Sequence, residues 1–573
     1  MSSDPSRPAS YGRREFLRQV SCGSLGVVGS SYLAAISGCT VQERRARRPD
    51  IVLILADDMG YSDIGCYGGE MRTPNIDGLA AHGLRFTHFH NGGRCCPSRA
   101  SLLTGLYAQQ AGVGDMMNDA GLPGYRGDLN ESCVTLAEVL KSAGYGTYAC
   151  GKWHVTRFIH AQSLEEKHNW PRQRGFDRFF GTINGACSSF EPQTLTLDND
   201  SAEDLVGEGF YYTNALGDHA VRFIGEHMDR DPGTPFFLYA AFTAPHWPLH
   251  APEEDLSQTR GRFDVGWDEL RRARYERQRA AGIVDPRWPL TERDPRVPAW
   301  EEAEDKAWQL RRMEVYAAQV EILDRNIGRI VSELERRGAL DDTLILFLSD
   351  NGGCAEEINT PGWYDDILRG GEGVSRERTL DGEPIQVGND PSVMPGAYDT
   401  YQSYGIPWAN VSNTPFRLYK SFDHEGGVAT PMIVHWPARI SAAGDLRHQV
   451  GHLIDIMPTL AGVAGAAYPT TFGERTITPM EGVRLVPAFS DATLEREAIY
   501  FEHEGRRAVL TGEWKLVARG RNAPWELCDM KVDRTETHDL AGERPEEVER
   551  LNGLWQAWAE RAQVLPRPGG GGG

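Results

Sequence analysis

Five short apolar runs, each followed directly by polar residues or a turn, constrain the fold of this chain most strongly. The runs are Ile51–Leu55, Gly146–Cys150, Phe236–Phe242, Leu344–Leu348 and Met432–His435. Runs this short and continuously apolar are typical of strands buried on both faces of a sheet. Segments of helical periodicity lie between them, so strand and helix alternate along the chain. This order predicts an α/β fold with a large mixed, mostly parallel sheet sandwiched by helices.

The clearest helical pattern covers Met313–Arg337, where apolar residues recur on one face and Gly338 marks the end. By contrast, residues 252–306 are highly charged and are interrupted by prolines, which indicates a surface insertion. Residues 366–412 are glycine-rich, and a loop of that length in a compact domain is usually functional or mobile.

The pattern changes after about residue 450. Strands of an antiparallel sheet are expected at Ala498–Glu502, Arg507–Leu510 and Trp514–Ala518. A closing helix should follow, with Val548, Leu551, Trp555 and Trp558 on its apolar face. We therefore predict a larger domain over residues 50–450, a smaller C-terminal α+β domain over residues 451–566, and a disordered tail over residues 567–573.

The first 39 residues have the layout of an export signal. Arg13 and Arg14 precede a modestly apolar stretch, as in twin-arginine signals. Ile36–Cys39 resembles a bacterial lipobox, in which Cys39 is lipidated; cleavage without a lipid is the alternative. Residues 40–49 would form a charged tether. The protein is thus expected to be exported, and to be periplasmic or lipid-anchored to the bacterial envelope, with Cys39 as its membrane attachment.

Charge and cysteine content narrow the classes of partner. The formal net charge is −21 at pH 7, and such an acidic surface repels phosphate backbones, so nucleic acid is not expected as a partner. The ten cysteines are scattered without the paired spacing of a zinc site. Their spacing leaves one or two disulfides open and requires none.

Polar residues follow four of the predicted strands, at the sheet edge where α/β proteins bind ligands. They are Asp57, Asp58, Lys152, His246, Asp350 and Asn351. Three carboxylates that converge on one edge repel one another unless a cation neutralises them. An all-oxygen set made of these carboxylates and Asn351 suits Ca²⁺, which tolerates irregular geometry better than Mg²⁺. Taken alone, Asp57-Asp58 is also compatible with a helix N-cap or a turn.

The segment Cys95–Gly105, with the sequence CCPSRASLLTG, carries the most specific chemical pattern. Pro97 suits the first turn of a helix, so Cys95 would lie at a helix N-terminus, where free N–H groups and the helix dipole favour anions. Arg99 adds a fixed positive charge. These features predict a thiol of low pKa at Cys95.

This segment matches the C-x-P-S-R-x-x-x-L-T-G pattern of the type I sulfatases, the arylsulfatase family of the alkaline phosphatase superfamily. A second family pattern is matched by Gly144–His154, and the resemblance extends from about Pro49 to about Pro566. It implies that residues 50–450 form a sulfatase catalytic domain. The adjacent Cys96 occupies a variable position of the pattern, and the spacing to Pro97 and Arg99 selects Cys95.

The resemblance implies a mechanism and its cofactors. A formylglycine-generating enzyme would oxidise Cys95 to formylglycine, whose hydrated aldehyde attacks the sulfur of a small-molecule or carbohydrate sulfate ester. An alcohol or phenol leaves, a covalent sulfo-enzyme intermediate forms, and inorganic sulfate is expelled as the aldehyde returns. One Ca²⁺ per chain would be bound by Asp57, Asp58, Asp350, Asn351 and the modified Cys95.

The remaining site residues follow from the same resemblance. Lys152 would contact the sulfate, and His154 would assist a hydroxyl of the hydrate. His246 would be a sulfate ligand and a candidate general acid, while Arg99 would brace the formylglycine. Lys420 would contact the leaving-group side, or protonate the leaving oxygen, which requires a depressed pKa.

Two other functions remain open at this point. A phosphonate monoester or phosphodiester hydrolase could share this fold and the formylglycine. An unmodified, inactive binding protein could retain the pocket. The sequence favours a sulfuric ester hydrolase, because the complete set of candidate site residues is present.

Overall fold

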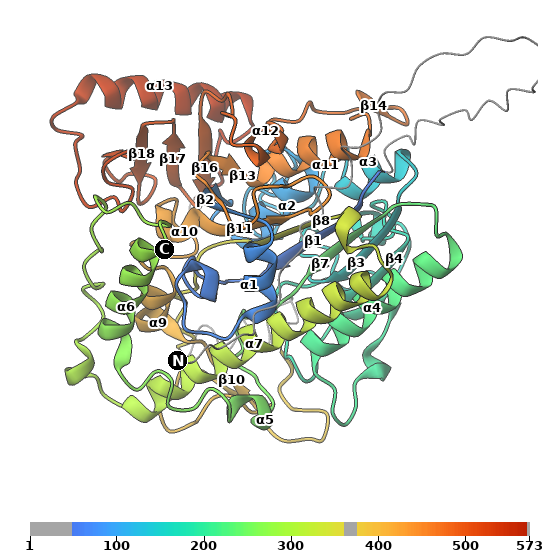
Figure 1. The fold of residues 1–573 in the computed structure, drawn as a ribbon, viewed down its shortest axis with the longest axis horizontal. Helices are drawn as coiled ribbons and strands as arrows, with labels where there is room; N and C mark the ends of the chain where they lie inside the picture. The colour runs from blue at the N-terminus through green and yellow to red at the C-terminus, as the bar shows by residue number, and fades with distance from the viewer. Residues whose placement is uncertain (1–47, 360–374, 570–573) are drawn as a thin grey trace, which may run out of the picture. The chain divides into compact units, whose positions relative to one another are not determined.

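The computed structural model describes residues 48–359 and 375–569, and its central element is an 11-stranded sheet (Figure 1). The predicted export signal, Cys39, most of the tether and the end of the tail lie outside the described residues. In spatial order the sheet contains β12 (Leu446–Arg447), β2 (Leu84–His90), β11 (Ala429–His435), β8 (Thr343–Ser349), β1 (Asp50–Ala56), β7 (Phe236–Ala241), β3 (Gly146–Gly151), β4 (Arg178–Thr182), β5 (Leu195–Leu197) and β6 (Asp200–Ser201), and β13 (Gly451–His452) also pairs with β2.

Strand directions in this sheet are mixed, with a parallel centre. β8, β1, β7, β3 and β4 are mutually parallel. β11 runs antiparallel to both β8 and β2, so β2 again runs in the direction of β1. At the far edge, β5 runs antiparallel to both of its neighbours, β4 and β6. The predicted mixed, mostly parallel sheet is confirmed, and each of the five apolar runs forms one of its strands.

Both faces of the sheet are buried under helices (Figure 1). Along β1, Val52 and Ile54 face one core cluster, whereas Leu53 and Leu55 face the other. The first cluster includes apolar residues of α4 (Tyr212–Arg230) and α7 (Lys306–Arg336). The second includes those of α2 (Cys95–Thr104), α3 (Leu136–Ser142) and α11 (Ile456–Ala464). Burial of alternate residues on opposite faces explains why these strands are continuously apolar.

Shorter elements complete the described chain. The remaining helices are α1 (Pro74–Ala81), α5 (Glu253–Leu256), α6 (Gly266–Ala280), α9 (Gly405–Ser412), α10 (Glu425–Val428), α12 (Val486–Phe489) and α13 (Pro545–Arg561). Short 3₁₀ helices cover Gly65–Tyr67, Glu166–Asn169, Glu203–Leu205, Trp300–Glu302, Leu340–Asp342 and Leu453–Asp455. Two small ribbons pair β9 (Gln386–Val387) with β10 (Thr400–Tyr401) and β14 (Thr471–Phe472) with β15 (Arg475–Thr476).

The interpretation of residues 252–306 as a surface insertion is wrong for α6. Trp267 and Leu270 of this helix belong to a core cluster. The fully buried Arg274 forms ion pairs with Asp63 and Glu70, each at 2.7 Å. A charged composition suggested solvent exposure, but part of the charge is paired inside the protein, which the sequence pattern does not reveal.

A separate four-stranded antiparallel sheet lies near the C-terminus (Figure 1). It consists of β16 (Ile499–His503), β17 (Arg506–Leu510), β18 (Trp514–Ala518) and β19 (Glu526–Asp529). One face packs on α13 through Leu551, Trp555 and Trp558. The other face shares a core cluster with Val428, which links it to the larger sheet. The strands and closing helix were predicted, except for β19, and the domain boundary after residue 450 stays a prediction.

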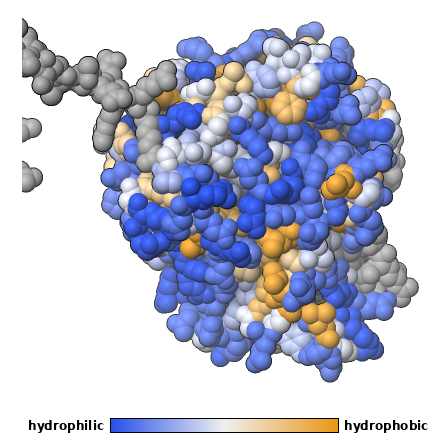
Figure 2. Space-filling view, turned by 90° about the vertical axis from the view of Figure 1, so that its right-hand side faces the viewer, coloured by the Kyte–Doolittle hydropathy of each residue, from blue (hydrophilic) through white to orange (hydrophobic). Residues whose placement is uncertain are grey.

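The surface shown in Figure 2 is mostly hydrophilic, with hydrophobic residues in small patches. No helix among the described residues combines the length and the apolar character needed to cross a membrane. Eight cysteines lie in the described ranges, and all eight are free thiols there.

Candidate active site

One edge of the large sheet gathers the predicted site residues. The parallel strands β1, β3, β7 and β8 end there, followed respectively by Asp57-Asp58, Lys152, His246 and Asp350-Asn351. β2 ends at the same edge, and the loop after it leads to Cys95. Because β11 is antiparallel, the segment before it reaches this edge, and that segment contains Lys420.

Cys95 is the first residue of α2 and lies at the wall of a cavity of about 220 Å³. The cavity is lined by Arg94, Cys95, Met116, His154, Asn184, Gly185, Ala186, His246, Trp247, Glu356 and Lys420. Cys96 instead belongs to the core beneath α2. A hydrogen bond with Cys96, together with the charges of Lys152 and Lys420, holds the pKa of Cys95 well below its usual range despite burial. The geometry agrees with a low-pKa thiol at residue 95.

A first group of buried charges surrounds Asp57. The Nζ of Lys152 donates to Asp57 Oδ2 at 2.7 Å, and Arg99 Nη2 lies 3.5 Å from the same oxygen. Arg99 also donates to Asp350 Oδ2 from Nη2 at 2.8 Å and from Nε at 3.1 Å. Arg99 is therefore clamped between two carboxylates, and its predicted role in bracing residue 95 stays a prediction.

A second group surrounds Asp58. Lys420 Nζ donates to Asp58 Oδ2 at 2.9 Å, and His246 Nε2 lies 3.4 Å from that oxygen. Asn351 Nδ2 donates to Asp58 Oδ1 at 2.6 Å. Burial opposes ionisation of Asp58, but the charge of Lys420 holds its pKa below the usual value. The two groups meet because Asp350 Oδ1 accepts from the backbone N–H of Asp58 at 3.3 Å.

The oxygen atoms at this edge fit a hard divalent cation. Asp57 Oδ1 and Asn351 Oδ1 are buried and have no hydrogen-bond partner among the described residues, which is costly unless a ligand binds them. Burial, and then repulsion by Asp350, raises the pKa of Asp57 well above its usual range. Burial also raises the pKa of Asp350. A cation bound to these oxygens would reverse both effects, so the residues present fit the expected metal.

Both histidines of the cavity are held neutral. Burial, and then the charge of Lys152, lowers the pKa of His154 to about 4. Burial lowers the pKa of His246 to about 3. His246 Nδ1 donates to the carbonyl of Trp247 at 2.6 Å, so its Nε2 is unprotonated and lies 3.3 Å from Lys420 Nζ. Burial opposes the charged form of Lys420, yet Asp58 keeps its pKa well above the usual value.

Left-handed backbone conformations cluster at the site. Asp58 has a φ of 66°, His154 of 57° and Ser421, next to Lys420, of 76°. Residues other than glycine rarely adopt such angles, and strain of this kind concentrates where side chains must be aimed at a ligand. Gly185 also permits a close approach, because a Cβ there would lie 2.1 Å from the His154 ring.

Sequence reasoning missed part of the cavity wall. Glu356 accepts hydrogen bonds from Arg94 Nη1 at 2.7 Å and from Trp247 Nε1 at 2.8 Å, and it lies 3.7 Å from Lys420 Nζ. Glu356 follows a Gly-Gly-Cys-Ala loop and precedes another glutamate, so the sequence resembles an ordinary exposed loop. Arg94 directly precedes Cys95, and that adjacency was the available clue.

Comparisons with known proteins agree with this geometry. A family model described as Sulfatase matches residues 49–466, and one described as N-sulphoglucosamine sulphohydrolase, C-terminal, matches residues 416–559. The chain belongs to the sulfatase family. It is 31% identical to an uncharacterized sulfatase of Schizosaccharomyces pombe, over 92% of this chain and 96% of the relative. It is also 31% identical to an arylsulfatase of Klebsiella aerogenes, over 81% of this chain and 95% of the relative.

The fold comparison is consistent with the sequence relatives. The solved structure of Ps i-CgsB, in complex with k-i-k-neocarrahexaose, superposes with a TM-score of 0.62 at 24% identity. The match covers 91% of this chain and 98% of that chain. The predicted type I sulfatase and its fold class are thus confirmed, and the protein is a sulfuric ester hydrolase.

Proposed function

We propose that this sulfatase hydrolyses sulfate esters with a formylglycine derived from Cys95 as nucleophile. The position of Cys95 carries the proposal: it opens α2, lines the cavity and shares that wall with His154, His246 and Lys420. A sulfate bound there would meet helix N–H groups and cationic side chains, which together favour an anion. The hydrated aldehyde would supply one hydroxyl to attack sulfur and a second whose deprotonation releases the sulfate.

His154 would accept a proton from the hydroxyl at residue 95. Ligand atoms of Cys95, Cys96 and His154 lie within 4.8 Å of one another. His154 Nδ1 is buried without a hydrogen-bond partner among the described residues, and the ring is neutral near pH 7 because its pKa is about 4. A neutral imidazole can act as a general base once the hydroxyl lies within hydrogen-bond reach of it.

Lys420 and His246 would act on the leaving oxygen together. In the tautomer that the Trp247 carbonyl imposes, neutral His246 offers a lone pair at Nε2 and no proton, whereas Lys420 holds a proton 3.3 Å away. His246 can therefore donate to the leaving group only after it has taken a proton, while Lys420 stabilises the developing negative charge directly. The depressed pKa that Lys420 would need as a free general acid is not observed.

Asp57, Asp58, Asp350 and Asn351 would hold one Ca²⁺ per chain together with the modified residue 95. When bound, this cation would supply Lewis-acid stabilisation of a sulfate oxygen. The unpartnered oxygens of Asp57 and Asn351 support the proposal, and the fully buried Arg99 keeps Asp350 oriented toward them.

Maturation of Cys95 would precede folding. The side chain is 2% exposed and lies at the start of a buried helix, so a formylglycine-generating enzyme has no access to it in the folded protein. The oxidation of the thiol also needs an external oxidant, which that partner enzyme would use.

A sulfated carbohydrate is the substrate class that we propose. The structural relative bound to neocarrahexaose supports this choice, and so does the mixed polar and aromatic cavity wall of Arg94, Glu356 and Trp247. Aryl sulfates would also enter the cavity at Cys95, since they differ from carbohydrate sulfates only in the leaving group.

Relative rates test the reaction class. The matured enzyme should hydrolyse 4-nitrophenyl sulfate and a sulfated oligosaccharide much faster than a matched aryl phosphodiester or phosphonate monoester. The Cys95→Ala variant serves as the blank for each substrate. Faster turnover of the phosphodiester than of the sulfate would replace the proposal with the phosphonate or phosphodiester hydrolase, and no turnover of any of them would favour a binding protein.

We also propose export through residues 1–39, with Cys39 as a lipid attachment point. Replacing Arg13 and Arg14 by lysine should retain the protein in the cytoplasm, and Cys39→Ala should release it from the membrane fraction. Unchanged fractionation of both variants would contradict this proposal.

A further inference from the structure

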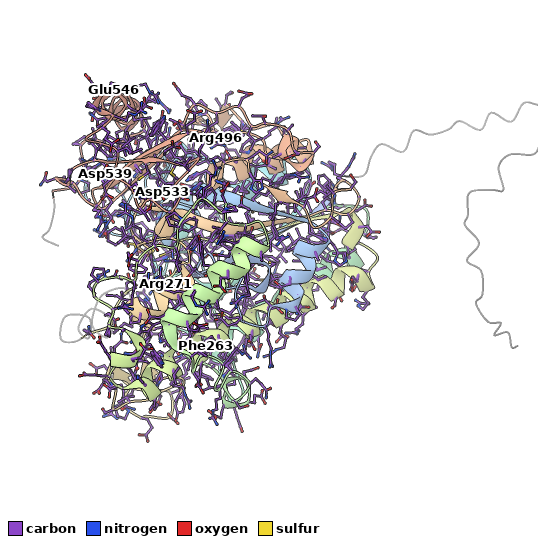
Figure 3. The ribbon with its side chains drawn as sticks, turned by 60° about the vertical axis from the view of Figure 1, so that its left-hand side comes forward. Phe263, Arg271, Arg496, Asp533, Asp539 and Glu546 are labelled. Carbon is purple, nitrogen blue, oxygen red and sulfur yellow. The ribbon has the colours of Figure 1, made fainter. Side chains whose placement is uncertain are left out.

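A second and larger cavity lies between α6, the segment after it, and the C-terminal sheet. Its volume is about 560 Å³, compared with about 220 Å³ at Cys95. From α6 and the segment after it, the lining residues are Arg279 and Gly282–Trp288. From the C-terminal part they are Leu510–Gly512, Met530, Lys531 and Arg534, and the rest of the wall consists of His88, His90, His448 and Val450. Figure 3 shows Arg271 of α6 and Asp533 on the same side of the molecule. We call this space the cationic cavity.

Positive charge predominates on its wall. The lining includes four fixed cations, Arg279, Arg287, Lys531 and Arg534, but only one carboxylate, Asp285. Asp285 is already paired with Arg287 at 2.8 Å, and Lys531 is paired with Glu513, which does not line the cavity. Arg279 lies over the Tyr275 ring at 5.6 Å, and none of the described carboxylates forms an ion pair with it. In a protein of net charge −21, such a wall is a local exception that would attract anions.

Arg534, which lines this cavity, has one buried donor group without a hydrogen-bond partner among the described residues. Its side chain is fully buried; Nε donates to Glu425 at 2.8 Å, and Nη1 donates to the carbonyl of Thr87. Nη2 has no hydrogen-bond partner among the described residues. Buried guanidinium N–H groups are normally paired, so an unpartnered one on a cavity wall indicates that an acceptor is missing.

Apolar and aromatic side chains form the rest of the wall. Trp288, Leu510 and Met530 are buried at the cavity, and the Arg534 guanidinium lies 5.9 Å from the Trp288 ring. An indole surface beside cations suits a ligand with both an apolar face and an anionic substituent. A sugar ring with a sulfate group has both features.

We propose that the cationic cavity is a second, non-catalytic binding site for a sulfated oligosaccharide. The sulfate groups would contact Arg279, Lys531 and Arg534, and a sugar ring would pack on Trp288. The site would hold a second part of the glycan, or a second chain, apart from the ester that is being cleaved. The ligand class rests on the proposed function, whereas the existence of an anion site rests on the cavity itself.

Binding measured without turnover tests the proposal. We would titrate the full-length Cys95→Ala protein with a size-defined sulfated carrageenan hexasaccharide by isothermal calorimetry, and repeat the titration with the desulfated sugar and with inorganic sulfate. Arg279→Ala and Lys531→Ala, alone and combined, remove exposed cations that are not part of the core. Arg272→Ala is the matched control, since Arg272 is an exposed arginine of the same helix that does not line the cavity.

The double variant should bind the sulfated hexasaccharide at least about tenfold more weakly, because two charge-assisted contacts are lost. Arg272→Ala should bind like its parent, and the desulfated sugar should not bind to the cavity. In the matured enzyme, the double variant should hydrolyse 4-nitrophenyl sulfate at the parental rate. Equal affinity of the double variant and its parent, or equal binding of the desulfated sugar, would overturn the proposal. A protein that binds the hexasaccharide at the cavity but hydrolyses no sulfate would instead overturn only the proposed function.

Discussion

Two buried ionic clusters of this protein look alike in composition and differ in whether the oxygens of their central carboxylates are all paired. One is the candidate active site around Asp57 and Asp58. The other joins the two sheets around Glu425, whose Oε1 accepts from Lys515 Nζ at 2.8 Å and whose Oε2 accepts from Arg534 Nε at 2.8 Å. His90 Nε2 lies 3.2 Å from both of these oxygens. Both oxygens of Glu425 are thus occupied by protein groups.

In the active-site cluster, by contrast, some side-chain oxygens accept no hydrogen bond from the described protein groups. Asp57 Oδ1 and Asn351 Oδ1 have no partner among the described residues, and Cys95 borders a cavity. A saturated buried carboxylate fixes the position of two elements, whereas an unsaturated one is prepared for a ligand. Burial and charge alone therefore do not separate the two clusters, whereas the pairing of their oxygens does.

The largest expected effect is on turnover at Cys95. Cys95→Ala should lower kcat by about 10⁴-fold or more, because the nucleophile is lost. Cys96→Ala should retain most of the activity, since Cys96 packs in the core and does not line the cavity. Steady-state rates with 4-nitrophenyl sulfate measure both variants. Substantial turnover by Cys95→Ala would show that residue 95 is not the nucleophile.

The next effect concerns the unpaired oxygens. Asp57→Asn should lower activity at least about a hundredfold and weaken Ca²⁺ binding, because one metal ligand loses its charge. Its thermal stability without metal should not fall, since the substitution removes a carboxylate that Asp350 repels. Equilibrium dialysis with Ca²⁺, together with rates before and after chelation, provides the measurement. Full activity in metal-free protein would show that this cluster is scaffold as well.

The matching substitution at Glu425 should have the opposite effect: it should lower stability and leave kcat nearly unchanged. Glu425→Gln should lower the free energy of unfolding by about 3 kcal/mol, because Lys515 and Arg534 lose their buried counter-charge. The kcat of the protein that remains folded should change little. Urea unfolding and kcat of the same preparation test this pair of outcomes. A large loss of kcat at unchanged stability would place Glu425 in the catalytic machinery and contradict the distinction between the two clusters.

The smallest effect is a pH dependence at Asp423. Burial, and then Glu502, raises the pKa of this carboxyl to about 8, and neither of its oxygens has a hydrogen-bond partner among the described residues. Because the folded pKa exceeds the unfolded one, stability from this group is complete below about pH 4 and is lost as the pH rises through 8. Between these two pKa values the slope should approach about 1.4 kcal/mol per pH unit. Asp423→Asn should flatten it, which melting temperatures at pH 6 and pH 8.5 would show; an unchanged slope would contradict the assignment.

Much of the site could be predicted because it depends on strand ends. Asp57, Lys152 and Asp350 follow continuously apolar strands, and parallel strands end at one edge. Glu356 could not be predicted, because its partners Arg94 and Trp247 come from loops far away in sequence. The burial of α6 was also hidden, since the ion pairs that bury Arg274 involve a distant segment.

The central claim is that residue 95 is a formylglycine. Peptide mass spectrometry of fully active enzyme, over a fragment that contains Cys95 and Cys96, tests it most directly. The account predicts an aldehyde at position 95 and an intact thiol at position 96, in proportion to the active fraction. An unmodified cysteine at position 95 throughout fully active enzyme would contradict it.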